Sequence, residues 1–297
     1  MRIKEDKYYG LLQGLSYSVT ILFSIACLLP FLLIISASLT ANDSIIRDGY
    51  HLIPSTFSLE GYRTVFRFPE DVLRAYGVTF FTTAVGTTLG LFFMTMAGYV
   101  LSRRDFKYRN AFSFYIYFTT LFGGGLVPWY ILYTKYLHLT DSYMALILPG
   151  LMTPFLIILM KNFIRTAVPE ELFESAKIDG AGDFRIYWRI VLQLSMPGIA
   201  TVGLFLALHY WNDWFSSSLY INDTHKYQLQ FHLYNVINSA SFIANMGAGT
   251  GVSLAGDLPT ESTKMAMAIV VTGPVLFLYP FIQRYFVKGL TIGAVKG

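Results

Sequence analysis

Long runs without a charged side chain constrain this chain more than any other feature of its sequence. Residues 15–39 form one uncharged, mostly apolar run, and residues 75–101 form a second. A helix of about 20 apolar residues crosses the hydrocarbon core of a bilayer. Lipid offers no hydrogen-bond partner to an open backbone, so a spanning segment satisfies its own amides as a helix. The sequence therefore predicts membrane-spanning helices.

Six such spans are expected, and the predicted fold class is all-α, that of a polytopic membrane protein. Only 13% of the residues are charged, about half the share typical of soluble domains. The first run is too long for a signal-peptide core and no A-x-A cleavage site follows it, so we expect it to be retained. The other four core spans are predicted at residues 110–134, 142–160, 194–210 and 265–281.

The positive residues indicate which side of the membrane each connection faces. Fifteen of the 22 Lys and Arg residues fall in four segments, and the alternate loops hold five. By the positive-inside rule, the four segments and both termini are cytoplasmic. Because the charges follow membrane side and do not gather on one face, the net charge of +4 indicates no nucleic-acid partner. The cytoplasmic segments are residues 1–14, 102–109, 161–190 and 281–297.

Motifs for chemistry are absent from the sequence. It has no G-x-x-x-x-G-K-[ST], H-E-x-x-H or G-x-S-x-G, so no catalytic residue, metal site or nucleotide site is predicted. The single cysteine, Cys27, excludes a disulfide framework and a cysteine metal site. We expect a non-catalytic membrane subunit that binds no cofactor itself.

A polar, helix-forming loop at residues 165–193 interrupts the apolar pattern. Pro169 and the acidic residues after it open a helix that is expected to run to about Asp179. Gly180 favours a helix end, and Asp183 is expected to cap a second helix. The segment therefore predicts a helix, a glycine turn and another helix. The second helix carries Phe184, Tyr187, Trp188 and Val191.

This loop resembles the one shared by binding-protein-dependent ABC importer permeases. The shared pattern is Glu-Ala-Ala, three residues, Gly, nine residues, Ile, one residue, Leu-Pro. The chain reads Glu174-Ser175-Ala176, Gly180, Ile190 and Leu192, with Ser175 in place of an alanine and Gln193 in place of the proline. The resemblance implies a type I ABC importer permease fold and an ATPase-coupling role for ten residues. These are Glu170, Glu171, Leu172, Phe173, Glu174, Ser175, Ala176, Asp179, Gly180 and Gly182.

The resemblance extends over nearly the whole chain and is strongest after residue 70. Residues 289–297, GLTIGAVKG, resemble the tail of the maltose-importer permease half that passes between the ATPase subunits. Residues 121–149, with FGGGLVP and LTDSYMALILP, resemble permeases for complex oligosaccharides of the pectin and alginate type. The tail residues implied to contact the ATPase are Gly289, Leu290, Thr291, Gly293, Lys296 and Gly297.

The resemblance also implies a domain plan. It comprises a cytoplasmic N-terminus at 1–14, a first span with an external loop at 15–73, an ABC transmembrane domain at 74–287 and a cytoplasmic tail at 288–297. The transmembrane domain contains the coupling loop 165–193.

A heteromeric complex in the bacterial cell (inner) membrane follows from the same resemblance. Its other members would be a second, non-identical permease subunit, two ATPase subunits that hold ATP and Mg²⁺, and an extracytoplasmic sugar-binding protein. This chain would form half of the pathway for a sugar or oligosaccharide. The alternative is an ion-coupled secondary transporter without an ATPase. The six core spans hold no Asp, Glu, Lys or Arg and only His209, which weakens proton coupling.

Aromatic and neutral polar residues are the candidates for substrate contact. Trp129, Tyr130, Trp211, Asn212 and Trp214 are candidates for lining the pathway, with an aromatic belt at the membrane interface as the alternative. Residues 211–261 are expected to form an extended outer segment that contacts a sugar or the binding protein, or else an ordinary surface loop. Its candidate contacts are Tyr220, Asn222, Tyr227, Gln228 and Tyr234.

Glycines and a proline within the third span leave two interpretations open. Gly123, Gly124, Gly125 and Pro128 are tolerated in a membrane helix where a neighbouring helix packs closely. The same residues also permit a bend that lines the pathway.

Overall fold

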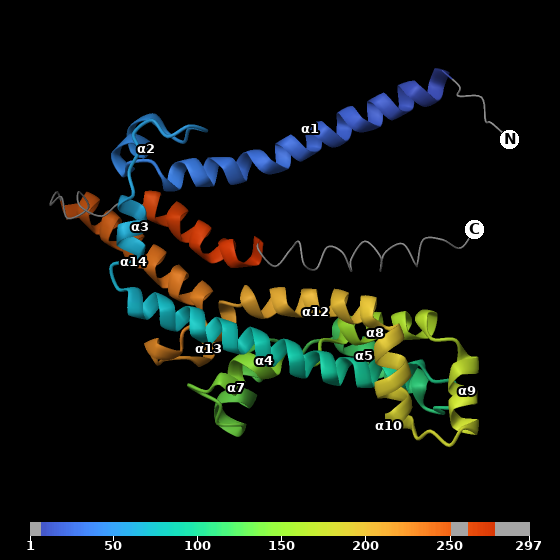
Figure 1. The fold of residues 1–297 in the computed structure, drawn as a ribbon. Coiled ribbons are helices and arrows are strands. Elements are labelled where there is room, and N and C mark those ends of the chain that lie inside the picture. Colours follow the sequence, from blue (N-terminus) through green and yellow to red (C-terminus); the bar gives the residue numbers. More distant parts are fainter. Residues whose placement is uncertain (1–6, 251–260, 277–297) are drawn as a thin grey trace. The chain divides into compact units, whose positions relative to one another are not determined.

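The computed structural model describes residues 7–250 and 261–276, and helices dominate them (Figure 1). Within those ranges there is no strand beyond one isolated bridge between Thr40 and Phe57. The all-α prediction is therefore confirmed. The chain divides into two compact units, residues 1–69 with 236–273, and residues 70–235 with 274–297.

Within the described residues, the apolar helices account for up to five spans by length and composition. Leu12–Ser38 and Pro69–Ser102 each suffice alone, and three bent pairs suffice when each pair is taken as one span. The sixth predicted span, 265–281, extends beyond the described residues, so the number six stays a prediction. The bent pairs are Arg109–Leu121 with Leu126–Tyr136 at 108°, Tyr143–Gly150 with Pro154–Ala167 at 48°, and Asp183–Leu194 with Met196–Trp211 at 82°.

The first unit contains three N-terminal helices and residues 261–273 of a helix that is described to residue 276. They are α1 (Lys7–Ser38), α2 (Asn42–Asp48) and α3 (Glu60–Val65). The Oδ1 atom of Asn42 accepts a hydrogen bond from the backbone N–H of Glu261 at 2.9 Å, and the Tyr50 hydroxyl donates to the Glu261 carboxylate at 2.8 Å. The segment predicted as the first external loop therefore folds into short helices that are hydrogen-bonded to residue 261.

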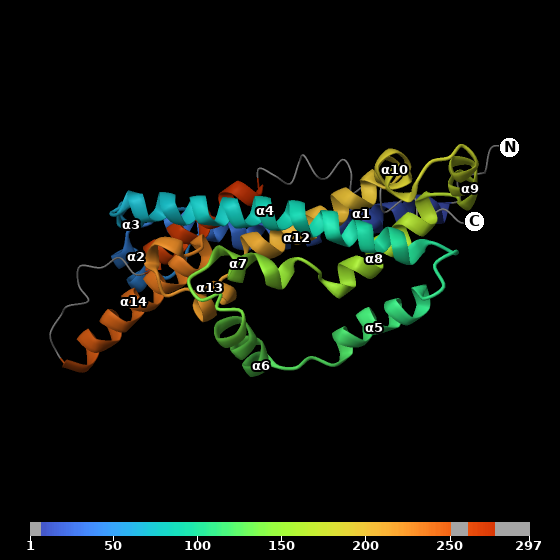
Figure 2. The same ribbon diagram turned by 90° about the horizontal axis from the view of Figure 1, so that it is seen from below.

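The second unit begins with one long helix, α4 (Pro69–Ser102), against which shorter helices pack. Figure 2 shows α4 and α12 running side by side. The other elements are α5 (Arg109–Leu121), α6 (Leu126–Ile131), the π-helical turn η1 (Leu132–Tyr136), α7 (Tyr143–Ile147), η2 (Leu148–Gly150), α8 (Pro154–Ala167), α9 (Glu170–Ile178), α10 (Asp183–Ile186), the π-helical turn η3 (Tyr187–Val191), α11 (Leu192–Leu194), α12 (Met196–Trp211), α13 (Phe215–Tyr220), η4 (Thr224–Lys226) and α14 (Leu229–Thr250), whose C-terminal part belongs to the first unit.

Three glycines form the packing face of α4. A Cβ atom added to Gly86 would lie 2.5 Å from the ring of Tyr210, and one added to Gly90 would lie 2.5 Å from Cδ2 of Leu206. A Cβ at Gly98 would lie 3.0 Å from the backbone nitrogen of Lys161 in α8. Small residues let helices approach closely where van der Waals packing drives association. This glycine face positions α12 and α8 against α4.

Prolines and glycines explain where the bent helices break. Pro197 stands in the first turn of α12, where its missing N–H costs no hydrogen bond, directly after the break at Ser195. In the third span the helix stops at Phe122, and Gly125 has a left-handed φ of 86°. No neighbour lies closer than 4.0 Å to a Cβ built at Gly123, Gly124 or Gly125. The close-crossing interpretation is thus wrong within the described chain. The bend itself is confirmed, and its role in lining the pathway stays a prediction.

The segment after α12, which the sequence predicted only as a long outer segment, contains two helices. Residues 215–220 and 229–250 are helical, and the start of α14 buries Leu229 and Phe231. Gln and Asn side chains fit a helix once another face of that helix is packed, which the polar composition did not reveal.

Candidate functional site: the helical loop 165–193

The loop begins with the helix that the sequence predicted. Pro169 precedes α9, two acidic residues occupy its first turn, and its C-terminal cap is Asp179. Gly180 follows with a left-handed φ of 75°, and its N–H donates to the carbonyl of Lys177 at 3.0 Å. Glycine takes this conformation without a Cβ clash, so the turn ends α9 where predicted.

The second helix starts differently from the prediction. Gly182 is the residue that caps α10, and no side chain makes a cap hydrogen bond there. Asp183 already lies in the first helical turn, and its carboxylate is 3.9 Å from Nζ of Lys177. The expectation that Asp183 caps the helix is therefore wrong, because the helix begins one residue earlier and the carboxylate faces a lysine.

An aromatic cluster attaches the loop to the core of the second unit. The Phe173 side chain is only 4% exposed, and its ring centroid lies 6.0 Å from that of Tyr99 on α4. The Tyr187 ring lies 5.8 Å from the same tyrosine, and its hydroxyl is 2.6 Å from Oγ1 of Thr95. Phe173, Tyr99 and Tyr187 thus join α9, α4 and η3 through buried rings.

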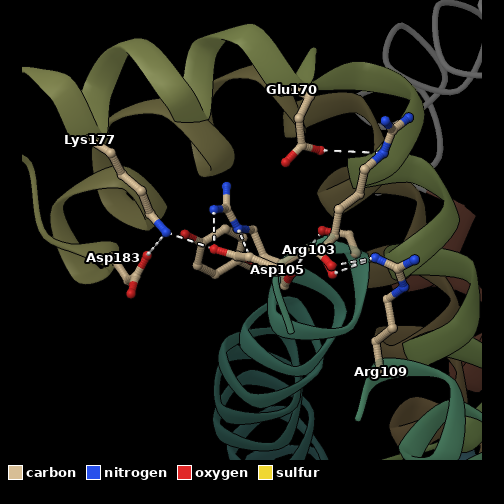
Figure 3. A network of polar contacts seen from close by, with 9 residues as sticks. Arg103, Asp105, Arg109, Glu170, Lys177 and Asp183 are labelled. Carbon is tan, nitrogen blue, oxygen red and sulfur yellow. Dashed lines mark hydrogen bonds and ion pairs between the residues drawn. The ribbon is translucent and has the colours of Figure 1, made fainter. Parts of the chain in front are cut away.

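A charged network covers this cluster, and we call its three members, Arg103, Asp105 and Lys177, the α9 clamp (Figure 3). The Arg103 guanidinium lies 4.3 Å from the Phe173 ring centroid and donates to both carboxylate oxygens of Asp105, at 3.1 and 2.8 Å. Lys177 Nζ donates to Oδ2 of the same carboxylate at 2.7 Å. These two cationic donors hold the pKa of Asp105 well below its usual range.

Further contacts order the segment 102–109 that carries the clamp. The Arg109 guanidinium donates to the carbonyl of Arg104 at 2.7 Å, which closes the loop on itself. Arg104 lies 3.8 Å from the Glu170 carboxylate in an exposed ion pair (Figure 3 shows Glu170). In the sequence analysis, this segment served only to assign one side of the membrane to the cytoplasm. An aspartate among four basic residues was the available signal that it also binds another loop.

The ten predicted coupling residues separate into two groups. Phe173 and, in part, Ala176 pack against the chain's own core, and Glu170 pairs with Arg104. The remaining seven are exposed: Glu171, Leu172, Glu174, Ser175, Asp179, Gly180 and Gly182. Beside them Ile178 is 86% exposed, an apolar residue that the sequence pattern did not single out as a contact.

The candidate pathway residues lie in different environments. Trp129 and Tyr130 are exposed on α6, and the Tyr130 ring stacks on Tyr220 with centroids 6.2 Å apart. Asn212 is exposed, and Trp214 stacks on Tyr234 with centroids 4.9 Å apart. Trp211 is only 6% exposed, so its side chain packs in the core and does not present a free face.

Two candidate contacts of the outer segment are buried. Gln228 is completely buried, accepts a hydrogen bond from the Ser217 hydroxyl at 2.9 Å and donates to Oγ1 of Thr82 at 3.1 Å. Tyr220 is also buried. Neither side chain can meet a protein at the surface, so the predicted contact role of both is wrong. Asn222 is exposed, Tyr234 is exposed and Tyr227 is half-buried.

One aspartate organises the exposed turn near these residues. Asp141 has a left-handed φ of 58°, and its carboxylate accepts the backbone N–H groups of Asn222 at 2.6 Å and Asp223 at 2.8 Å. Lys226 Nζ donates to the Asp141 carbonyl at 2.9 Å. The two backbone donors lower the pKa of Asp141. We call Asp141, Asn222, Asp223 and Lys226 the Asp141 turn.

The predicted tail contacts at residues 289–297 lie outside the described residues. Among the described residues, no group of three or more His, Cys, Asp or Glu side chains is arranged to hold a metal ion.

Comparisons with known proteins agree with this architecture. The profile of the family described as binding-protein-dependent transport system inner membrane component matches residues 86–292. The polygalacturonan/rhamnogalacturonan transport system permease protein YtcP of Bacillus subtilis is 40% identical over 97% of this chain and 99% of its own length. Protein LplC of the same organism is 42% identical over 91% of this chain and 90% of its own length.

A solved structure extends the likeness to three dimensions. It is a crystal structure of a bacterial ABC transporter involved in the import of the acidic polysaccharide alginate. The aligned chain has a TM-score of 0.77 and 26% identity, covering 96% of this chain and 99% of that one. Fold and sequence thus agree, and this chain belongs to the family of binding-protein-dependent transport system inner membrane components.

Proposed function

We propose that this chain is a permease subunit of an ATP-driven importer and forms half of the pathway for an oligosaccharide. The observation that carries the proposal is α9, which is anchored by Phe173 on one side and exposes an acidic and apolar surface on the other. A short helix anchored in this way can seat in a cleft of a partner and move with it. Family membership supports transport as the activity, and nothing supports the alternative of an autonomous ion-coupled carrier.

The partner of α9 is an ATPase subunit in this proposal. ATP and Mg²⁺ bind to that subunit, and this chain holds no cofactor and performs no catalysis. The exposed residues of α9, among them Glu171, Leu172 and Glu174, supply the contact, and Phe173 carries the movement to the core of the permease. The complex also contains a second, non-identical permease subunit, two ATPase subunits and an extracytoplasmic binding protein.

An acidic oligosaccharide is the substrate class that we propose. The relatives include a polygalacturonan/rhamnogalacturonan permease and a transporter of the acidic polysaccharide alginate. The exposed, stacked rings of Trp214 and Tyr234 offer an apolar face of the kind that packs on a sugar ring. The other proposed pathway or outer contacts are Trp129, Tyr130, Asn212, Asn222 and Tyr227.

Placement in the membrane follows from the charge distribution. We propose a multi-pass protein of the bacterial cell membrane with six spans, both termini in the cytoplasm and the domain plan given above. The tail at 289–297 contacts the ATPase subunits. Its deletion should lower the yield of the complex or the coupling of ATP hydrolysis, while the spans still insert.

One reconstitution experiment tests the proposal. The complex is assembled in liposomes with its second permease and ATPase subunits, and ATP hydrolysis is measured with a panel of loaded binding proteins. We expect stimulation by binding proteins loaded with acidic oligosaccharides and not by unloaded ones. Liposomes that contain this chain alone should take up no sugar, and uptake by them would contradict the proposal.

A further inference from the structure

The connection between α9 and α4 is made only by side chains. The peptide chain joins α9 to α8 on one side and to α10 on the other, and α4 ends 68 residues before α9 begins. α4 nevertheless carries the glycine face on which α12 and α8 pack. Any displacement of α9 therefore reaches α4 directly through contacts near Tyr99, Arg103 and Asp105.

We propose that Asp105 is a positioning residue for energy coupling, which fixes α9 to the end of α4 so that the two move as one body. This inference rests on the proposed function and concerns how α9 transmits force. The aromatic contact of α9 with α4 is insufficient alone, because the tilted rings of Phe173 and Tyr99, 6.0 Å apart, form no hydrogen bond that resists sliding.

Asp105 differs from the other carboxylates near α9 in the number of cationic side chains that it binds. Its carboxylate holds Arg103 in a bidentate geometry, which keeps the guanidinium over Phe173, and it also accepts from Lys177 on α9. Bidentate pairs of arginine with a carboxylate fix orientation as well as distance. One carboxylate thus fixes both the ring beneath α9 and the lysine at its end.

The other ion pairs of the loop are poorer candidates. Arg104 and Glu170 are 3.8 Å apart, and the Arg104 side chain is 72% exposed. Asp183 is 3.9 Å from Lys177 and is also 72% exposed. Exposed pairs of this length contribute little, because water screens them and both side chains keep other conformations. The two pairs provide matched comparisons for the clamp.

Without the clamp, α9 has two places at which it can tilt independently of α4. One is the extended link Val168–Pro169 before it, and the other is the turn at Gly180 after it. We expect such tilting to absorb the movement of a bound ATPase. Hydrolysis would then continue while transport falls.

The first test compares Asp105→Asn with wild type in the full reconstituted complex. We expect the oligosaccharide transported per ATP hydrolysed to fall about fivefold, the lower end of measured coupling effects. Basal hydrolysis and the yield of the complex should stay at wild-type values, because the Asp105 side chain is half exposed. Arg104→Gln, which removes a charge from the same segment, should change the ratio less than twofold.

A reversible cross-link separates positioning from general stability. Asp105 and Lys177 are both replaced by Cys in a Cys27→Ser background, since Cys27 is the only native cysteine. A short bis-methanethiosulfonate linker then replaces the ion pair by a covalent one. We expect low coupling before linkage, at least half the wild-type ratio after it, and low coupling again after reduction.

Several outcomes would overturn the inference. Three results would each refute the positioning role, provided that the wild-type complex transports. They are a wild-type ratio of transport to hydrolysis in Asp105→Asn, an equal fall of basal hydrolysis and transport in that variant, and a cross-linked protein that stays uncoupled. A wild-type complex that hydrolyses ATP without moving any oligosaccharide would instead overturn the proposed function and the inference with it.

Discussion

The α9 clamp and the Asp141 turn both depend on one aspartate, yet the two aspartates bind different kinds of donor. Asp105 accepts from the side chains of Arg103 and Lys177. Asp141 accepts chiefly from the backbone N–H groups of Asn222 and Asp223, with a longer contact of 3.4 Å from the Asn222 side-chain amide, and only its carbonyl accepts from a lysine. Both are charge-assisted contacts, which are stronger than neutral hydrogen bonds.

The two kinds of donor differ in how firmly they hold their position and in how they respond to substitution and salt. Backbone donors have fixed positions, are lost only on substitution by proline and keep their hydrogens at any pH, so we expect the Asp141 turn to hold one conformation. Side-chain donors sit on flexible stems, can be exchanged singly and are screened by salt. In our proposal the clamp therefore joins two elements that move together, whereas we expect the turn to hold a rigid surface.

The largest effect on the clamped region should come from Gly180→Pro. Proline fixes φ near −65°, whereas Gly180 has a φ of 75°, and proline also loses the N–H that donates to Lys177. We expect transport by the reconstituted complex to fall at least tenfold, given a local cost of about 3 kcal/mol. Gly180→Asn, whose side chain tolerates left-handed φ, should retain most activity. Equal loss in both variants would contradict the role of backbone conformation.

A smaller effect should follow from Asp141→Ala, which tests the fixed turn. The variant leaves two backbone N–H groups without their acceptor, and each lost hydrogen bond to a charged group costs about 1.5–3 kcal/mol before water replaces it. We expect a lower midpoint of thermal unfolding in detergent and unchanged basal hydrolysis in the complex. Asp141→Asn keeps one carbonyl acceptor and should recover part of the loss. An unaltered midpoint for Asp141→Ala would show that the turn contributes nothing.

Substituting one lysine in each region compares them directly. Lys177→Gln removes a direct donor to the Asp105 carboxylate, and Lys226→Gln removes a donor to a carbonyl that leaves both carboxylate contacts of Asp141 intact. We expect hydrogen exchange at residues 170–178 to quicken about two- to fivefold in the first variant, and exchange at 222–223 to change little in the second. Equal changes of the exchange rate in the two variants would show that the clamp and the Asp141 turn do not differ in this way.

Mild acid should have the smallest effect. The pKa values of Asp105 and Asp141 are both lowered in the folded protein. A lowered pKa gives stability that is complete above the unfolded value of about 4 and is lost only as pH falls below it toward the folded value. We expect hydrogen-exchange protection of both regions, corrected for intrinsic rates, to be the same at pH 7 and pH 5. Loss of protection at one of the two sites at pH 5 would refute the assignment at that site.

The sequence predicted the parts of the loop that depend on local chemistry. Pro169 and Gly180 act through their own backbone, and the acidic first turn acts through carboxylates at the adjacent helix end, so α9 begins and ends where expected. The bend at 122–125 was one of two open interpretations, because glycines serve both close packing and chain reversal. Only the absence of a neighbour around Gly123 decided between them.

Contacts between distant segments were not predictable in the same way. Asp105 and Lys177 are 72 residues apart, and the four basic residues of 102–109 allowed many pairings. Gln228 has a polar side chain typical of a surface, yet it is buried because Ser217 and Thr82 satisfy its hydrogen bonds. The burial of such a side chain cannot be predicted until the fold shows which hydrogen-bond partners surround it.

The glycine face of α4 also limits which insertions and deletions the gene can accept. One added residue between Gly86 and Gly98 would rotate everything after it by about 100° around the helix axis. Gly98 would then leave α8, and a bulkier residue would meet the backbone of Lys161. We therefore expect selection to remove insertions and deletions in this part of α4, even where single substitutions on its exposed side are neutral.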